Sequence, residues 1–325
     1  MKRVVKISAY TIVAILVIVL LFVAFVRFSP LPDYEPGKIP EITVEITPER
    51  IAEGHRISSM LCQGCHYNPD TRRMDGKRMM DTPEIFGKFY SANITQDPDH
   101  GIGKWSDGEL YYYLRTGIRK DGHFSGVMPN FPKVADEDLQ SLIAYLHSDL
   151  EEVQPSSLPS QVSEYALLGR FLKHFILKPK AYPAETIPLP DTTNTIVWGS
   201  YLANDLYSCY GCHSGSFTTN DDDNPPNSKL YYGGGNKMLD LEGNTIYSSN
   251  LTPDPETGIG NWTPDQFTRL LKYGLKPDGN PVSYPMVPHS GLTPGEIDAI
   301  YRFLKTVPAI HNDVTNGTAQ AAIQR

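Results

Sequence analysis

The chain has 325 residues with 29 basic and 37 acidic side chains, which gives a formal net charge of −8 at pH 7. This length allows two ordinary domains, and the 26 glycines and 27 prolines predict long, shaped loops within them. The acidic balance excludes nucleic acid as an expected partner, because binding phosphates requires a basic surface.

The first residues have the composition of a membrane-spanning helix. Three basic side chains lie within the first six residues, and the twenty residues from Ile7 to Val26 carry no charge. Twenty such residues match the length of a helix that crosses a bilayer. A cleaved signal peptide is the alternative, but its apolar region is shorter and ends in small residues. We therefore expect an uncleaved anchor at 1–28, with the following residues on the periplasmic side of the cytoplasmic membrane.

The rest of the chain contains an internal duplication. CQGCH at 62–66 returns as CYGCH at 209–213, at an offset of 147. NITQDPDHGIGKWSDGEL at 93–110 returns as NLTPDPETGIGNWTPDQF at 250–267, at an offset of 157. The second copy therefore carries about ten extra residues, which we expect around 221–227. A repeat of this size predicts two tandem copies of one structural unit.

Each copy has the same predicted layout of helices. One helix leads into the cysteine pair, at about 49–61 and 195–208, a second begins near Ser106 or Thr263, and a third is opened by Asp136 or Thr293. The third helix has apolar residues at i, i+3, i+4 and i+7, which predicts one buried face. These residues are Leu139, Leu142, Ile143 and Leu146 in the first copy and Ile297, Ile300, Tyr301 and Leu304 in the second. No alternating strand pattern competes, so the expected fold class is all-α.

The predicted domains are 29–150 and 191–325, joined by a linker at 151–190. Within the linker, residues 165–179 mix apolar and basic side chains, which is typical of an amphipathic helix. We expect this helix to pack across the two domains. A helix lying on the membrane surface is the alternative.

All four cysteines lie in the two pentapeptides. Two thiols one helical turn apart can form thioethers with the vinyl groups of a haem, and the histidine that follows then binds the iron. A zinc site would place its two cysteine pairs much closer together, and a thioredoxin-like pair needs a βαβ context. Disulfides would leave the histidines unexplained. The motif predicts two covalently attached haem c groups, held by Cys62, Cys65 and His66 and by Cys209, Cys212 and His213.

The duplication also selects a ligand for the opposite face of each iron. Met128 (in GVMPN) and Met286 (in YPMVPHS) occupy matching places beside a proline, whereas His123 and Met80 have no counterpart in the second copy. Proline stiffens a loop that holds a thioether. The alternative is that both methionines are core residues. Ligation by His66 and Met128, and by His213 and Met286, would raise the potentials and fill both axial positions, so we expect no catalytic residues.

Other motif residues have less specific interpretations. Trp105 and Trp262 either pack on the haems or belong to the core. Asn93 and Asn250 lie in N-x-T sequences, and their place in the duplicated loop favours a loop-shaping role over glycosylation. The acidic run at 221–223 is expected to be a solvated loop, with docking as the alternative.

Taken together, CxxCH, N-[IL]-T-x-D-P-x-x-G-I-G-x-W, a short helix ending in glycine and a methionine–proline loop resemble the membrane-bound cytochrome c subunits of bacterial alcohol, aldehyde and gluconate dehydrogenases. The resemblance covers nearly the whole chain after about residue 45. It implies two tandem cytochrome c-type haem domains that take electrons from a catalytic subunit and pass them to quinone or an oxidase. That family commonly has three haem units and often a C-terminal anchor, whereas this chain has two predicted units and a predicted N-terminal anchor.

The leading functional hypothesis is a membrane-anchored dihaem cytochrome c that relays single electrons from a dehydrogenase or respiratory complex to a downstream acceptor. The partners would be redox proteins. Residues after 27 contain 25 basic and 37 acidic side chains, a formal charge of −12 that is compatible with steering toward a basic partner. The alternatives are a dihaem enzyme, of the peroxidase or thiosulfate dehydrogenase type, and a wiring subunit of a larger respiratory complex.

Overall fold

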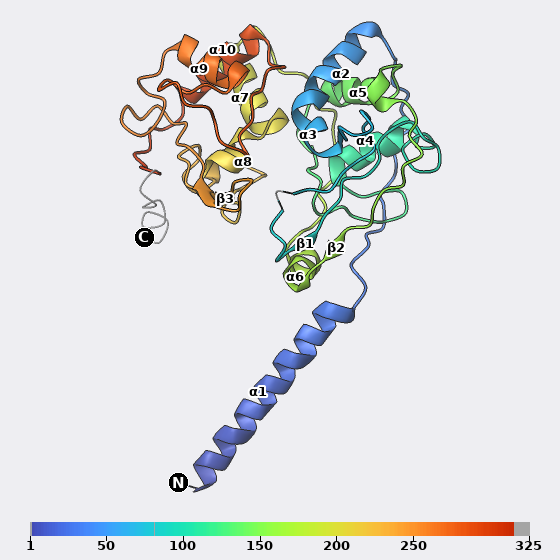
Figure 1. The fold of residues 1–325 in the computed structure, drawn as a ribbon, viewed down its shortest axis with the longest axis vertical. Coiled ribbons are helices and arrows are strands. Elements are labelled where there is room, and N and C mark those ends of the chain that lie inside the picture. The colour runs from blue at the N-terminus through green and yellow to red at the C-terminus, as the bar shows by residue number, and fades with distance from the viewer. Residues whose placement is uncertain (1, 81, 315–325) are drawn as a thin grey trace.

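The computed structural model describes residues 2–80 and 82–314 (Figure 1). Helix α1, Lys2–Phe28, projects away from the rest of the molecule as one long rod (Figure 1). Within the described residues, one helix is long and apolar enough to cross a membrane, and it is this one, from Arg3 to Phe28. The predicted N-terminal apolar helix is therefore confirmed.

Two helical units follow, and Figure 1 shows them side by side. We call residues 29–150 the first unit and residues 191–314 the second unit. The first unit contains α2 (Pro48–Leu61), α3 (Gln63–His66), α4 (Asp107–Thr116) and α5 (Asp136–Leu146). The second contains α7 (Thr195–Tyr201), which continues as the π-helical η2 (Leu202–Leu206), then α8 (Cys209–His213), α9 (Pro264–Tyr273) and α10 (Pro294–Leu304). The helices expected from the sequence are present in both copies.

Short non-α elements complete the chain. They are the 3₁₀ turns η1 (Glu151–Val153) and η3 (Pro225–Asn227) and the strands β1 (Gly87–Lys88), β2 (Glu164–Tyr165), β3 (Lys237–Leu239) and β4 (Thr245–Tyr247). β1 pairs antiparallel with β2, and β3 with β4. The fold is thus mostly helical rather than all-α. The sequence did not predict these strands, because strands of two or three residues are too short to produce an alternating pattern.

Matching caps begin and end the middle helix of each unit. Ser106 before α4 and Thr263 before α9 each form a capping box with the residue three positions on, Glu109 or Gln266. Each helix ends at a left-handed glycine, at φ 75° after α4 and φ 68° after α9. The predicted starts at Ser106 and Thr263 are therefore confirmed.

The predicted apolar faces of α5 and α10 form the core of their units. In α5 the four predicted residues are between 0% and 8% exposed, and in α10 three of the four are at most 3% exposed. Tyr301 is the exception, since it is half-buried and its hydroxyl donates to the backbone oxygen of Trp262 at 2.7 Å. These helices supply the apolar burial that stabilises each unit.

A glycine lies where the first helix of each unit crosses the last. α2 meets α5 at Gly54, where an added Cβ would lie 1.8 Å from the carbonyl oxygen of Ser141. α7 meets α10 at Gly199, where an added Cβ would lie 2.0 Å from the carbonyl oxygen of Ala299. At both crossings the backbones approach so closely that no side chain fits between them.

Buried polar contacts join the two units. Arg56 on α2 donates to Glu296 on α10 at 2.7 Å. The hydroxyl of Tyr201 on α7 donates to the carboxylate of Asp138 on α5 and accepts from the backbone N–H of Ala135 at 3.0 Å. Burial raises the pKa of Asp138 to about 6. These side chains hold α7 and α10 against α2 and α5.

The prediction that the amphipathic segment packs across the two domains is wrong. Helix α6, Leu167–Phe175, packs between the end of α1 and the lower edge of the first unit (Figure 1). Arg170 contacts the backbone of α1 at Val26, and Lys173 donates to the backbone oxygen of Phe124 in the first unit. The sequence showed the amphipathic character of this segment, but its neighbours are about 50 and 145 positions away and could not be read from it.

Candidate functional sites

Each pentapeptide forms a short helical turn, α3 in the first unit and α8 in the second. In the first, the backbone N–H of His66 donates to the carbonyl of Cys62 at 2.9 Å, so the histidine follows the first cysteine by one turn. The four cysteines form no disulfide. Among the described residues there is also no group of three or more His, Cys, Asp or Glu side chains that could hold a metal ion.

The two pentapeptide histidines are oriented by the same hydrogen bond. Nδ1 of His66 lies 2.8 Å from the carbonyl oxygen of Ala92, and Nδ1 of His213 lies 2.9 Å from that of Ser249. Because a carbonyl can only accept, Nδ1 carries the proton and Nε2 keeps its lone pair, which is the form that binds iron. The surrounding protein disfavours the charged ring and lowers the pKa of both imidazoles. Each ring is therefore a neutral donor with a fixed direction.

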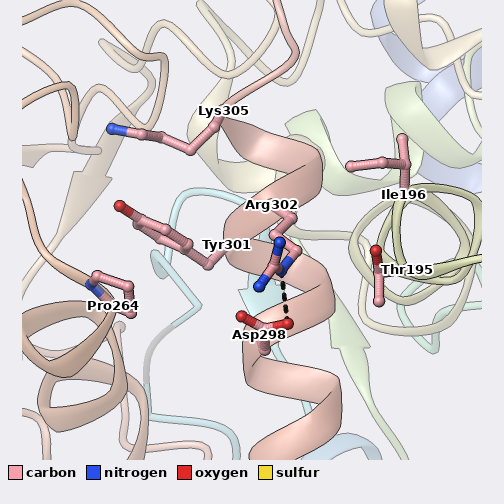
Figure 2. A pocket seen from close by; sticks show the side chains of 7 residues that line it. All are labelled: Thr195, Ile196, Pro264, Asp298, Tyr301, Arg302 and Lys305. Carbon is pink, nitrogen blue, oxygen red and sulfur yellow. Dashed lines mark hydrogen bonds and ion pairs between the residues drawn. The ribbon is translucent and has the colours of Figure 1, made fainter.

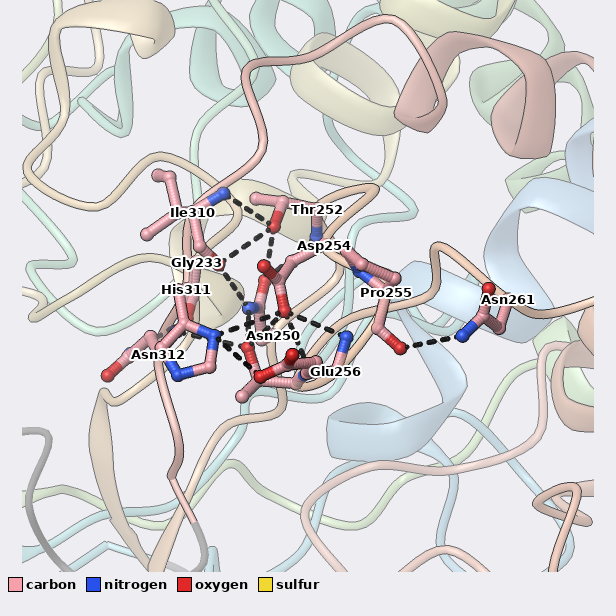
Figure 3. Close-up of polar contacts among 11 residues, drawn as sticks. Gly233, Asn250, Thr252, Asp254, Pro255, Glu256, Asn261, Ile310, His311 and Asn312 are labelled. Carbon is pink, nitrogen blue, oxygen red and sulfur yellow. Dashed lines mark hydrogen bonds and ion pairs between the residues drawn. The ribbon is translucent and has the colours of Figure 1, made fainter.

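These carbonyls are held in place by the N-x-T turns that follow them. Asn93 is 3% exposed, its Oδ1 accepts from the backbone and hydroxyl of Thr95, and its Nδ2 donates to two backbone oxygens. Asn250 has the same bonds to Thr252, and its Nδ2 donates to the carbonyl of Ile310 at 2.7 Å (Figure 3). A buried amide with all its partners cannot carry a glycan. The loop-shaping interpretation is confirmed.

Part of the remaining duplicated loop also repeats the same hydrogen bonds. Oδ1 of Asp97 accepts from two backbone N–H groups, and Oδ1 of Asp254 does the same in the second unit (Figure 3). Both tryptophans follow and are half-buried. The ring of Trp105 packs edge-on against Tyr113, with centroids 5.6 Å apart. Hydrogen bonds within the loop therefore help to determine its shape, in addition to contacts with distant residues.

Matching backbone hydrogen bonds hold both ends of the two methionine loops, residues 125–131 and 282–289. Each loop starts with a bond to the glycine that ends the middle helix, from Ser125 to Gly117 and from Val282 to Gly274. It ends with a bond to that helix, from Phe131 to Leu114 and from His289 to Leu271. Met128 and Met286 lie between these two fixed points, half-buried against the core of their units.

Two methionines of the first unit have clearly different surroundings. Met74 is fully buried in the core, and Met80 is 72% exposed.

A second pair of methionines occupies matching places. Met79 and Met238 are both half-buried, and each lies two residues after a residue whose backbone N–H donates to Ser91 or Ser248. Met128 and Met286 are the matching pair in loops that are tied at both ends to the middle helix. Their role as iron ligands stays a prediction.

Sequence reasoning missed two serines at these sites. The hydroxyl of Ser91 donates to the carbonyl of Cys65 at 2.6 Å and accepts from the backbone N–H of Lys77. Ser248 accepts in the same way from the backbone N–H of Asn236 at 3.0 Å. The sequence did contain a signal for these serines. YSAN at 90–93 and YSSN at 247–250 each end on the asparagine of the N-x-T sequence and are related by the same offset of 157. These serines tie the loop that orients the histidine to the chain beyond the pentapeptide.

The extra residues of the second copy lie where the duplication placed them. His66 accepts a backbone bond from Gly76, and His213 accepts the corresponding bond from Gly234, so the added segment falls between His213 and Gly234. Within it, Asp222 forms an ion pair with Lys180 of the linker at 2.8 Å. The acidic run is therefore partly tied to the linker rather than fully solvated.

A shallow depression between α7, α9 and α10 lies on the second unit (Figure 2). Its lining residues are Thr195, Ile196, Pro264, Asp298, Tyr301, Arg302 and Lys305. Asp298 and Arg302 neutralise each other in an ion pair of 2.7 Å. None of the lining residues belongs to a pentapeptide or a methionine loop, so this depression is separate from the candidate sites.

The chain is similar to known cytochromes. A family model described as cytochrome c oxidase, cbb3-type, subunit III matches residues 49–146. The fructose dehydrogenase cytochrome subunit of Gluconobacter japonicus is 30% identical over 280 residues, which are 80% of this chain and 53% of that one. The cytochrome c subunit of alcohol dehydrogenase (quinone) of Gluconacetobacter polyoxogenes is 29% identical over 77% of this chain and 54% of its own. A diheme c-type cytochrome of Cereibacter sphaeroides is 28% identical over 83% and 90%.

The helical fold, the CxxCH turns with their oriented histidines and the family match together define a c-type cytochrome, a class with covalently attached haem c. Within this class, the chain is homologous to the cytochrome c subunits of fructose, alcohol and gluconate dehydrogenases. It spans about half the length of these relatives. The resemblance seen in the sequence motifs is confirmed for the alcohol and gluconate enzymes.

Proposed function

We propose that the chain is a membrane-anchored dihaem cytochrome c that relays single electrons. The observation that carries this proposal is the pair of matching histidines, each with Nδ1 bonded to a carbonyl and Nε2 left as the donor. One such ring would support one haem. The same arrangement in two units, each with a CxxCH turn, supports two tandem haem domains.

The residues present fit a haem c in each unit. Cys62 and Cys65, or Cys209 and Cys212, would hold the macrocycle by thioethers. His66 and His213 would bind iron through Nε2, with Met128 and Met286 on the opposite face. When bound, the haem would supply reversible one-electron chemistry, and the Met128 and Met286 loops, which are tied at both ends, would hold the thioethers in place. The protein's own part is to hold these ligands still, so that little reorganisation accompanies each transfer.

With a histidine and a methionine on each iron, no position would be left for a substrate, which favours a relay over an enzyme. The relatives are cytochrome subunits of dehydrogenases. By analogy, this chain would receive electrons from a dehydrogenase subunit or respiratory complex and pass them to a downstream acceptor. With α1 retained as the anchor, both haem domains would lie on the periplasmic side of the cytoplasmic membrane.

The first test concerns the number of haems. Acid–acetone extraction should leave all haem on the polypeptide, and the pyridine haemochrome assay should give two haems per chain. The double variant Cys209→Ala/Cys212→Ala should give one, because only the first unit keeps its thioethers. Recovery of a single haem from the unmodified chain would contradict the dihaem proposal.

The second test separates a relay from a dihaem enzyme. The reduced protein should bind carbon monoxide slowly or not at all, and turnover with peroxide or thiosulfate should be negligible, because both axial positions are filled. Electron exchange with a basic redox protein should slow as salt is added. Turnover with either substrate at rates on the order of ten per second would show an enzyme instead.

A further inference from the structure

Helix α1 sets the level of the membrane relative to the rest of the molecule. Its uncharged stretch from Ile7 to Val26 is about 30 Å long at 1.5 Å per residue, which equals the thickness of the hydrocarbon layer. Val26 therefore lies at the edge of that layer when α1 spans the membrane. Side chains that contact the last turns of α1 lie at the same depth.

Helix α6 makes those contacts. Phe22 of α1 packs against Phe171 and Phe175 of α6, with ring centroids 6.3 and 5.8 Å apart. Val26 is 2% exposed, although the rest of the apolar stretch is exposed. Arg170 donates to the carbonyl of Val26 at 2.8 Å and to the carbonyl of Ser29. The carbonyl of Val26 lies in the last turn of α1, and that of Ser29 follows the helix directly, so α6 supplies hydrogen-bond donors at this end.

The opposite side of α6 is joined to the first unit. An added Cβ at Gly169 would lie 2.0 Å from the carbonyl oxygen of Phe86, so α6 lies directly on that backbone. Lys173 is fully buried, donates to the carbonyl of Phe124 and lies 5.2 Å from the ring centroid of Tyr165. The helix is thus held between the anchor and the first unit by specific contacts on two of its sides.

Its third side is apolar and uncovered. Leu167, Leu168 and Ile176 are 44%, 37% and 61% exposed, and Phe175 is partly exposed beside them. Lys178 next to this face is also exposed. Apolar side chains at the depth of the hydrocarbon edge, flanked by basic ones, are the composition of a helix that lies in the membrane interface.

We propose that α6 is an interfacial membrane helix whose apolar face enters the bilayer at the hydrocarbon–headgroup boundary and fixes the first unit against the membrane. This rests on the proposed function in two respects, the retained anchor and the thioether-bound cysteines. It assigns α6 a lipid surface as its partner, because the contacts with α1 place its exposed face at that depth. The first unit then lies nearer the membrane than the second.

Site-directed spin labelling of the full haem-loaded chain tests this proposal. Because the four native cysteines would be consumed by the haems, a fifth one can be labelled alone in Ile176→Cys, Leu168→Cys and, as a control, Phe217→Cys. Phe217 is 57% exposed and lies in the second unit. The chains are reconstituted in vesicles of equal parts phosphatidylcholine and phosphatidylglycerol. Relaxation by oxygen, which partitions into lipid, is compared with relaxation by a water-soluble nickel chelate.

Labels at 176 and 168 should be relaxed by oxygen and shielded from nickel, with an oxygen-to-nickel ratio severalfold higher than that at 217. A ratio at 176 and 168 equal to that at 217 would overturn the proposal, because the face would then be in water. A failure of the proposed function would look different, since free native cysteines would give more than one label per chain.

Discussion

Replacing Met128 by histidine should lower the reduction potential of one haem by on the order of 100 mV or more and leave the other haem nearly unchanged. A histidine imidazole stabilises the ferric state relative to a thioether, and the two methionine loops belong to separate units. Met286→His should lower the potential of the other haem in the same way. Each variant should also lose about half of the weak sulfur-to-iron band of the oxidised protein, and the double variant should lose all of it. Potentiometric titration followed in the visible spectrum measures both effects.

Met80→His is the matched control, because Met80 is 72% exposed and has no equivalent in the second unit. It should change neither potential nor the sulfur-to-iron band. The ligand assignment is wrong if both loop variants keep the full band, or if the wild-type protein never shows it. A shift of both potentials in a single variant would instead mean that the two haems are strongly coupled.

Alanine in place of Gly54 or Gly199 should destabilise the affected unit by roughly 3 kcal/mol or more. In an ordinary helix, Gly→Ala stabilises by about 1 kcal/mol, so the expected sign is reversed. The cause is geometric, because the new Cβ would meet a backbone oxygen at 1.8 Å for Gly54 and 2.0 Å for Gly199. The facing helix must move apart, and neither backbone can yield as a flexible side chain could.

Gly295→Ala in α10 provides the control. A Cβ there would meet the ring of Trp198 at 3.6 Å, an ordinary contact, so stability should be unchanged or slightly raised. Urea unfolding followed by far-ultraviolet circular dichroism and by the haem absorption gives the midpoint for each variant. Equal midpoints for Gly54→Ala, Gly199→Ala and Gly295→Ala would show that the helices do not cross as closely as the structure places them.

The parts of this protein that could be predicted from its sequence are those carried by neighbouring residues. Both capping boxes join residues three positions apart, the apolar faces of α5 and α10 repeat within eleven residues, and each CxxCH motif is a single turn. The internal repeat added a second reading of each signal. It singled out Met128 and Met286 as the proposed ligands, and it identified Asn93 and Asn250 as loop residues because both recur in one motif.

What the tertiary structure decided depends on residues far apart in the chain. The carbonyl that orients His66 comes from a residue 26 positions later, and Arg170 reaches the end of α1 across 144 positions. From the sequence alone, a glycine inside a predicted helix indicates lower helix stability. Its role at a helix crossing depends on the backbone of the facing helix, which only the tertiary structure shows. The prediction of where α6 packs was wrong for the same reason. An amphipathic pattern shows that one face will be buried, but the fold alone determines which surface covers it, because burial depends on the neighbour as much as on the helix.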